Sequence, residues 1–423
     1  MGTTYSFFMV LQKGRHALTQ KRIYFISLSF PPLGRGASLT NSCLAKGLSQ
    51  KFKVNVITAG ELKTYFLSYN KDYSLLKDIP THIEIIRIKP FEWFFIGEGL
   101  YRFGLIPCYH LNWAISTIKK IKTIFTKSGI ILSSYPVVSN LLVGLWAKKK
   151  TDFPLIIDFR DDYLGVMSHY MNPSGKMLAS YIEKNVVKKA DRITVATEGI
   201  KDALIKRYPD LTKKIDIIYN LVPFDSNSLS SIKDENKKNK LFTMIYAGNF
   251  SPAQEVKLLI KGINRLLDIH PELKGKIVFK LFGPENRYLK KEIIPLLNNE
   301  IRYEGYAERN KLIKEIKRAD VGLFSLSNKT FSYATPTKLF EFIELEVPIL
   351  AMLPKGSARE IIEKDNIGLV CDPNDIDGFA RNIYSLFRNE SLRKKIVKNI
   401  KKIKDHYSFS TQINRWINVI EEL

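Results

Sequence analysis

The sequence alternates short apolar segments with longer amphipathic segments, and this rhythm stops once and then starts again. Near-continuous apolar segments separated by helices indicate strands of a parallel sheet that is covered on both faces. In the first half the predicted strands are 22–30, 54–58, 83–88, 129–132, 155–158, 192–196 and 215–219. The predicted helices are 39–52, 137–149, 173–190 and 200–208. Ligands of such sheets bind beyond the carboxyl ends of the strands.

The alternation of apolar and amphipathic segments starts again at residue 242. The predicted strands are 242–246, 276–281, 301–303, 321–326, 348–352 and 368–371. The predicted helices are 252–269, 288–297, 311–319, 338–345, 358–363, 375–387, 392–405 and 411–421. A chain of 423 residues is too long for one core, so we predict two domains. The expected divisions are a loose extension 1–21, a first domain 22–220, a turn-rich and polar linker 221–240, and a second domain 241–407.

One stretch, 334–351, combines a polar loop, a helix and a strand. Thr335 or Thr337 is expected to cap the helix, with Pro336 near its first position. The free N–H groups of a helix start suit a phosphate, and Lys338 adds a positive charge there. Glu341, one turn further on, is placed to bind ribose hydroxyls. The plainer interpretation is an ordinary capped helix with a solvated lysine and glutamate.

The net charge of +24 predicts an acidic partner. Residues 90–126 crowd many aromatic side chains together before a run of lysines, which favours contact with an anionic membrane surface. The alternative is that these aromatics form core beneath a solvated basic helix. No nucleic-acid-binding motif is present, so we expect no nucleic acid partner.

Two further features bear on the cellular setting. Residues 128–147 carry no charge, but serines, Tyr135, Pro136 and Asn140 interrupt them, so we predict a strand and a helix and no membrane span. The three cysteines are far apart and odd in number, which suggests a reducing cytosol and no metal cluster.

Several short motifs, in order along residues 22–420, resemble those of glycosyltransferase family 4 enzymes. In the first half they are Phe30-Pro31-Pro32-Leu33-Gly34-Arg35-Gly36-Ala37-Ser38, Asp158-Phe159-Arg160-Asp161 and Ala190-Asp191-Arg192-Ile193-Thr194-Val195. In the second half they include Tyr246-Ala247-Gly248-Asn249-Phe250-Ser251-Pro252-Ala253-Gln254, Leu281-Phe282-Gly283-Pro284, Tyr303-Glu304-Gly305-Tyr306, Ala319-Asp320-Val321-Gly322-Leu323 and Thr337-Lys338-Leu339-Phe340-Glu341-Phe342. Their forms are similar to the bacterial branch that builds surface polysaccharides.

The resemblance implies the GT-B fold, in which two Rossmann-like domains face each other across a cleft. It implies a nucleotide-sugar donor on the second domain, an acceptor on the first, and transfer with retention of anomeric configuration. It implies no cofactor and no bound metal. The last helix, within 408–423, is expected to return to the first domain with Trp416. The expected reaction moves a hexose or N-acetylhexosamine to a growing, lipid-linked surface glycan, in the cytoplasm at the inner membrane face.

The resemblance also assigns residues. Glu341 is similar to a ribose-binding glutamate, and Thr335, Thr337 and Lys338 are expected to face the donor diphosphate. The other expected donor contacts are Gly34, Arg35, Gly36, Asn249, Gln254, Gly283, Pro284 and Tyr306. Asp161 and Lys338 are the expected catalytic residues, Asp161 near the acceptor; the plainer role for Asp161 is a helix cap.

The sequence departs from the family pattern in two places. Tyr333 stands where many members have a second glutamate, and Asn249 and Gln254 stand where many have arginine and lysine. We therefore expect Lys338, with Arg35, to replace the missing cations. Two alternatives stay open: a nucleotide-sugar epimerase of the same fold, and a non-catalytic nucleotide-sugar-binding protein.

Overall fold

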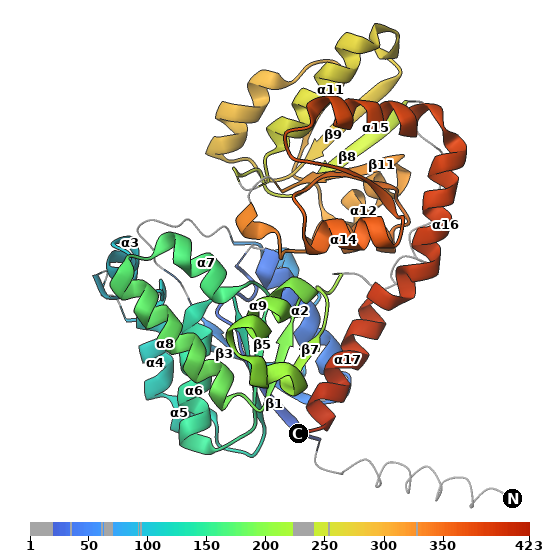
Figure 1. Cartoon of the computed structure of the whole chain (residues 1–423). Helices are drawn as coiled ribbons and strands as arrows, with labels where there is room; N and C mark the ends of the chain where they lie inside the picture. Colours follow the sequence, from blue (N-terminus) through green and yellow to red (C-terminus); the bar gives the residue numbers. More distant parts are fainter. Residues whose placement is uncertain are drawn as a thin grey trace, which may run out of the picture.

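The computed structural model describes residues 20–33, 36–60, 62, 71–91, 93, 95–222, 241–252, 254–326 and 329–423. Two α/β domains lie one above the other in Figure 1, and the C-terminal helices run down one side from the second domain to the first. The predicted fold class is confirmed. Gly34, Arg35, nearly all of the predicted extension 1–21 and nearly all of the predicted linker 221–240 lie outside the described residues.

The first domain is built on a parallel sheet whose strand order is β3-β2-β1-β4-β5-β6-β7 in the described part of the chain. Its strands are β1 (Arg22–Ile26), β2 (Lys53–Ala59), β3 (Glu84–Ile88), β4 (Ile130–Tyr135), β5 (Leu155–Phe159), β6 (Arg192–Val195) and β7 (Ile215–Ile217). Its helices include α2 (Gly36–Leu48), α3 (Leu100–Arg102), α4 (Leu111–Lys119), α5 (Ile121–Ile124), α6 (Val138–Thr151), α7 (Tyr163–Tyr170), α8 (Pro173–Lys189) and α9 (Glu198–Arg207).

Two apolar clusters cover the two faces of this sheet. Because side chains alternate along a strand, Ile23 and Phe25 of β1 join one cluster while Tyr24 and Ile26 join the other. The first cluster is completed by α2 and the last helix, and the second by α4, α6, α8 and α9. A sheet buried on both faces explains why its strands are almost continuously apolar.

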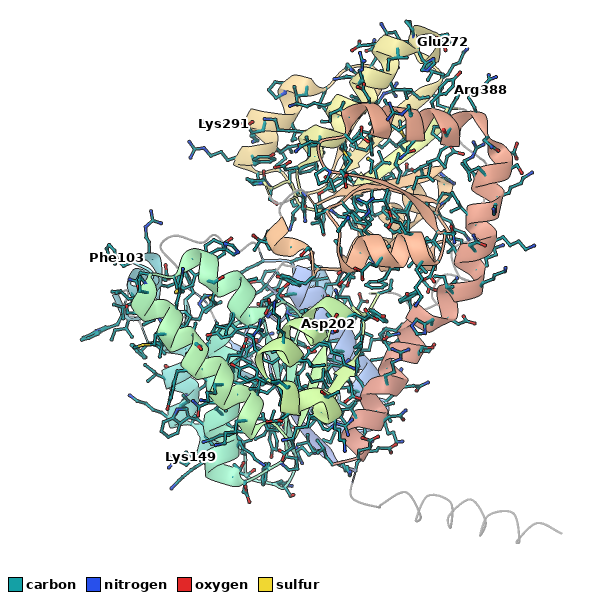
Figure 2. All side chains as sticks on the ribbon, in the orientation of Figure 1. Phe103, Lys149, Asp202, Glu272, Lys291 and Arg388 are labelled. Atoms are coloured by element: carbon teal, nitrogen blue, oxygen red, sulfur yellow. The ribbon has the colours of Figure 1, made fainter. Side chains whose placement is uncertain are left out.

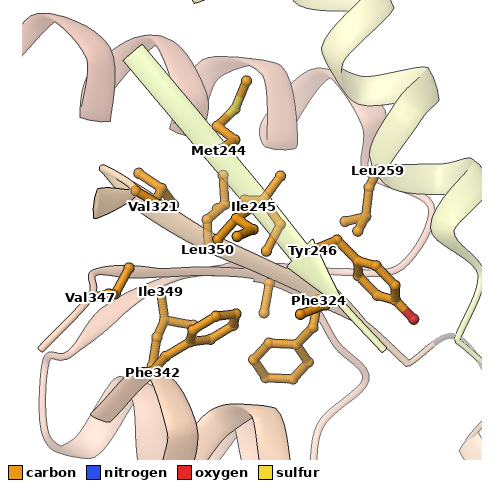
Figure 3. Packing of buried hydrophobic residues seen from close by; sticks show 14 of the residues in the cluster. Met244, Ile245, Tyr246, Leu259, Val321, Phe324, Phe342, Val347, Ile349 and Leu350 are labelled. Carbon is orange, nitrogen blue, oxygen red and sulfur yellow. The ribbon is translucent and has the colours of Figure 1, made fainter. Parts of the chain in front are cut away.

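The second domain repeats this plan with the strand order β10-β9-β8-β11-β12-β13. Its strands are β8 (Phe242–Ala247), β9 (Ile277–Phe282), β10 (Ile301–Gly305), β11 (Val321–Ser325), β12 (Ile349–Met352) and β13 (Gly368–Cys371). Its helices include α11 (Val256–Ile269), α12 (Arg309–Arg318), α13 (Thr337–Glu344), α14 (Ser357–Lys364) and α15 (Ile376–Arg388). Figure 3 shows Leu259 of α11 and Phe342 of α13 reaching the same core from different sides. The Phe342 ring lies directly over Gly322 of β11, where a Cβ atom would come within 2.6 Å of it.

The last two helices connect the domains a second time. Helix α16 (Glu390–Tyr407) packs on α13, and α17 (Phe409–Glu421) follows after Ser408 and packs on α2 (Figure 1). Trp416 of α17 is completely buried in the first domain's core. The predicted return of the C-terminal helix to the first domain is therefore confirmed.

Some predicted elements differ from the structure. Strand β4 continues through Ser133 and Ser134 to Tyr135. The Ser134 hydroxyl donates to Asp158 at 2.8 Å, which satisfies its buried polar atom. Helix α11 starts at Val256, since Glu255 just before it has a left-handed φ of 33°. The predicted helix 288–297 is a π turn and a 3-10 turn that contains Pro295. Helix α7 was not predicted.

The aromatic segment 90–126 is divided between core and surface. Trp113 is fully buried, whereas Trp93 and Phe103 are 67% and 72% exposed. The core interpretation therefore holds for Trp113, and contact of the exposed aromatics with a membrane stays a prediction. Phe94 lies outside the described residues. No helix in the described ranges combines the length and apolar character that crossing a membrane requires.

Candidate functional site

The loops at the carboxyl ends of both sheets meet between the domains. The Asn220 side chain donates to the Thr335 carbonyl at 2.9 Å, and the Tyr306 hydroxyl donates to Asp72 at 3.2 Å. The Gly199 N–H donates to the Ser357 hydroxyl at 3.3 Å. The predicted site residues of the second domain therefore lie along a boundary with the first.

Helix α13 begins without a side-chain cap. Its N-cap residue is Pro336, and neither Thr335 nor Thr337 caps it, so that expectation was wrong. The reason is that Pro336, which has no side-chain acceptor, occupies the N-cap position. Thr335 is buried, and its hydroxyl has no hydrogen-bond partner within the described chain. The first N–H groups of α13 thus keep the arrangement that favours a phosphate group.

Lys338 lies against the loop that follows β8. Its Nζ is 3.9 Å from the centroid of the Tyr246 ring, a cation–π contact. Gly248 leaves room for this side chain, because a Cβ atom there would come within 2.4 Å of the Lys338 Cε. Removal of the ammonium group from water lowers the pKa of Lys338 to about 7, although the nearby Glu341 carboxylate acts in the opposite direction.

Tyr246 organises two of the predicted donor residues. Its hydroxyl donates to the Asn249 carbonyl at 2.5 Å and lies 2.7 Å from the Gln254 side-chain oxygen. The Asn249 side chain is exposed, whereas Gln254 is half-buried and turned toward Tyr246. Sequence reasoning did not single out Tyr246, although it directly precedes the Ala247-Gly248 turn and is the one ring in contact with Lys338 among the described residues.

Gly283 holds three loops of the second domain together. A Cβ atom at Gly283 would come within 2.0 Å of the Gly248 carbonyl oxygen, so only glycine fits there. The Gly283 N–H donates to the Gly305 carbonyl at 3.1 Å. Pro284 follows it and is half-buried, and Tyr306 is 66% exposed. The structure thus brings the loops that carry Gly283, Pro284 and Tyr306 close to the loop after β8, against which Lys338 lies.

Glu341 is nearly buried and forms an ion pair with Arg309. The Arg309 guanidinium donates to Glu341 Oε1 at 3.0 Å. Arg309 is the first residue of α12 and was not predicted as a site residue. No local sequence signal marks it, because its partner Glu341 lies on another helix. Ribose binding by Glu341 stays a prediction.

Asp161 does not cap a helix. The N-cap of α7 is Asp162, and Asp161 instead accepts a hydrogen bond from the Tyr333 hydroxyl at 3.3 Å, across the domain boundary. Burial raises the pKa of Asp161 to about 6, although the Tyr333 hydrogen bond and the Arg160 charge lower it. Tyr333, at the position that departs from the family pattern, packs into the first domain's core.

The two expected catalytic residues fall into separate groups. Asp161 lies with Tyr333, and Lys338 lies with Tyr246 and Gly248. Gly34 and Arg35 lie outside the described residues, and Gly36 is the first residue of α2. No cluster of three or more histidine, cysteine or acidic side chains within the described ranges is arranged to hold a metal ion.

A cavity of about 330 Å³ lies beside Asp161 between the two domains. First-domain residues of α7 and α9 form one wall, and the loop before α13 and the start of α14 form the other. It is lined by Asp162, Gly165, His169, Gly199, Asp202, Ala203, Thr330, Ser332, Tyr333, Gly356, Ser357 and Glu360. Carboxylates and hydroxyls predominate in this lining, which suits a polyhydroxylated ligand.

Residues 228–403 match the family model described as glycosyl transferases group 1. The chain is 24% identical over 384 residues to an uncharacterized glycosyltransferase of Methanocaldococcus jannaschii, which covers 85% of this chain and 93% of that protein. It is 21% identical to a Campylobacter jejuni protein named as an N-acetylgalactosaminyltransferase acting on a sugar diphospho-undecaprenol, over 53% of this chain and 58% of that one.

Solved structures share the fold. Sucrose-phosphate synthase from Thermosynechococcus elongatus matches with a TM-score of 0.69 at 13% identity, covering 95% of this chain and 98% of that one. An E. coli trehalose-6-phosphate structure with bound UDP-2-fluoro glucose matches with a TM-score of 0.66 at 11% identity, covering 95% and 99%. WaaG, a glycosyltransferase involved in lipopolysaccharide biosynthesis, matches at 0.64 and 13% identity, covering 94% and 99%.

Proposed function

We propose that this chain, a glycosyltransferase with a group 1 domain in a GT-B fold, moves a hexose or N-acetylhexosamine from a nucleoside-diphosphate sugar to a lipid-linked glycan, with retention of configuration. The solved neighbour with bound UDP-2-fluoro glucose and the relative that acts on a diphospho-undecaprenol sugar support the donor and acceptor classes. The proposed location is the cytoplasmic face of an anionic membrane.

The observation that carries the proposal is the pairing of the uncapped α13 start with Lys338. The partly buried ammonium group of Lys338 has no carboxylate within 4 Å among the described residues. A diphosphate bound at the α13 N–H groups supplies the missing anion. The cation is then held in advance, where the negative charge of the leaving diphosphate increases during transfer.

The reaction breaks the bond between the sugar C1 and the diphosphate oxygen and forms a bond between C1 and the acceptor oxygen. The acceptor proton passes to the leaving phosphate oxygen on the face where the acceptor attacks. Glu341 binds the ribose hydroxyls, and Asp161 holds the acceptor near the cavity. The proposed reaction uses no metal and no cofactor.

The first test is a thermal-shift panel of UDP-, GDP-, ADP- and CMP-sugars on the wild type and Glu341→Ala. Free ligand at about 100 times its dissociation constant stabilises by roughly 2.7 kcal/mol, which corresponds to about 5–10 °C for domains of this size. We expect one nucleotide series to stabilise the wild type and to lose most of this effect in Glu341→Ala. The donor class then follows from the series that binds.

Turnover separates the proposal from its alternatives. Transfer requires an acceptor, so a sugar product formed from donor alone would identify an epimerase. Donor binding without any product, tested with a range of lipid-linked acceptors, would identify a non-catalytic binding protein. Lys338→Ala is expected to lower transfer about 100- to 1000-fold. A loss of less than about threefold would remove Lys338 from the proposed mechanism.

A further inference from the structure

Exposed apolar side chains gather on one surface of the first domain. Isolated exposed apolar residues are ordinary, but a contiguous group marks an interaction surface. Met177 is 75% exposed, Phe103 72% and Tyr181 66%. We call this group the α8 patch, and it consists of Phe103, Leu105, Tyr170, Met177, Leu178 and Tyr181.

Hydrogen bonds make these residues neighbours. The Asn172 side chain, the N-cap of α8, donates to the Phe103 carbonyl at 3.2 Å, and its N–H donates to the Gly104 carbonyl at 3.1 Å. A Cβ atom at Gly175 would come within 2.1 Å of that Gly104 oxygen. The loop after α3 is therefore held against the first turn of α8. Figure 2 shows Phe103 at the outer edge of the first domain.

The exposed side of α8 carries only positive charge. Its exposed charged residues are Lys176, Lys184, Lys188 and Lys189. The single acidic residue of the helix, Glu183, is fully buried and accepts a hydrogen bond from Arg207 at 2.8 Å. Helix α6, which packs on α8, adds Trp146 with the Lys149 ammonium 5.3 Å from its ring. Lysines thus border an apolar surface.

We propose that the α8 patch binds the surface of an anionic lipid bilayer. The aromatic and aliphatic side chains enter the boundary between headgroups and acyl chains, and the lysines contact anionic headgroups. The sequence placed a membrane contact on residues 90–126. The structure buries Trp113 from that segment and leaves Phe103 and Leu105 exposed beside α8. The binding surface is therefore formed mainly by α8.

This surface lies next to the candidate site, and here the inference rests on the proposed lipid-linked acceptor. Helix α7 leads from Asp162, which lines the interdomain cavity, to Tyr170 in the α8 patch. Its eight residues span about 12 Å. His169, which precedes Tyr170, also lines the cavity. A membrane held by the patch lies beside the cavity, so a lipid-linked sugar reaches the cavity while its lipid stays in the bilayer.

Vesicle flotation of the full chain, without donor, tests the proposal. We expect the wild type to bind vesicles rich in phosphatidylglycerol, and to bind vesicles of pure phosphatidylcholine at least tenfold more weakly. Binding to the anionic vesicles should weaken as the sodium chloride concentration increases. The double variant Met177→Glu/Tyr181→Glu should lose at least tenfold in binding. The matched control is Ile269→Glu/Ile294→Glu, which changes two exposed apolar residues of the second domain and should stay within twofold of the wild type.

Equal binding by the wild type and the patch variant, with both folded by circular dichroism, would overturn the proposal. So would a wild-type dimer in light scattering that becomes a monomer in the patch variant, because a second copy of the chain would then cover the patch. Donor binding is measured without vesicles. If no nucleotide sugar binds but vesicle binding persists, the proposed function is refuted and the proposed membrane-binding surface is retained.

Discussion

Lys338 is the residue whose chemistry is most sensitive to its surroundings. Its ammonium group lies on the Tyr246 ring and beside Gly248, and its pKa is lowered to about 7. A lysine with such a pKa changes charge around neutral pH. A bound diphosphate favours the charged form, so donor binding and proton uptake by Lys338 are coupled.

This coupling predicts a pH-dependent donor affinity. Below pH 7 Lys338 is already charged, and the affinity for a nucleotide sugar should be greatest. Above pH 7 binding must first protonate Lys338, so the dissociation constant should rise by up to about tenfold per pH unit. Calorimetry with an intact nucleotide sugar, whose diphosphate does not titrate in this range, measures the effect. In the control Lys338→Arg, where the cation stays charged, a similar pH dependence would contradict the assignment.

Tyr333, which belongs to the second domain, affects the pKa of Asp161 in the first domain. Its hydrogen bond favours the ionised carboxylate and opposes the effect of burial on the pKa of Asp161. Tyr333→Phe should therefore raise that pKa above its value of about 6, and the acidic limb of the rate–pH profile should move to higher pH. Tyr73→Phe, which changes an exposed tyrosine, is the control. An unmoved acidic limb in Tyr333→Phe would show that Asp161 does not set it.

At the scale of elements, the donor loops depend on close backbone contact. Gly283→Ala places a methyl group against the Gly248 carbonyl, and we expect a loss of about 1–3 kcal/mol in unfolding free energy. Donor affinity should fall as well, because the Gly248 loop is displaced from Lys338. Gly60→Ala is the matched control, since its nearest described neighbour lies at an ordinary 3.6 Å. Urea denaturation measures the unfolding free energy of both variants, and donor titration measures their donor affinity.

Most regular elements followed from apolar periodicity, but α7 did not. Its first turn is fixed from outside, where the buried Glu183 carboxylate accepts a hydrogen bond from the Leu164 N–H at 3.3 Å and pairs with Arg207. Contacts between residues distant in sequence leave no local pattern. The same reason hid Arg309, whose partner Glu341 lies on another helix. Gly283 was singled out because it belongs to a local motif, although its close approach to the Gly248 carbonyl was not predicted.

At the scale of the whole molecule, α17 completes the first domain. Trp416 is fully buried against strands and α2, so Trp416→Ala should lower the unfolding free energy by about 3–5 kcal/mol. Trp93→Ala removes an exposed tryptophan and should change stability by less than about 0.5 kcal/mol. Calorimetry should show the transition of the first domain shifted in Trp416→Ala. A shift confined to the second domain would mean that α17 supports that domain instead.

The return of α17 also sets an order of events during synthesis. A ribosome makes β1 and α2 first, then the whole second domain, and only afterwards the helix that covers one face of the first sheet. The nascent first domain therefore lacks α17 over the cluster that contains Ile23, Phe25 and Leu44 while some two hundred residues are added. At translation rates of roughly 5–20 residues per second, that delay lasts on the order of ten seconds or more. During this delay, chaperones that bind apolar surfaces can bind the emerging chain.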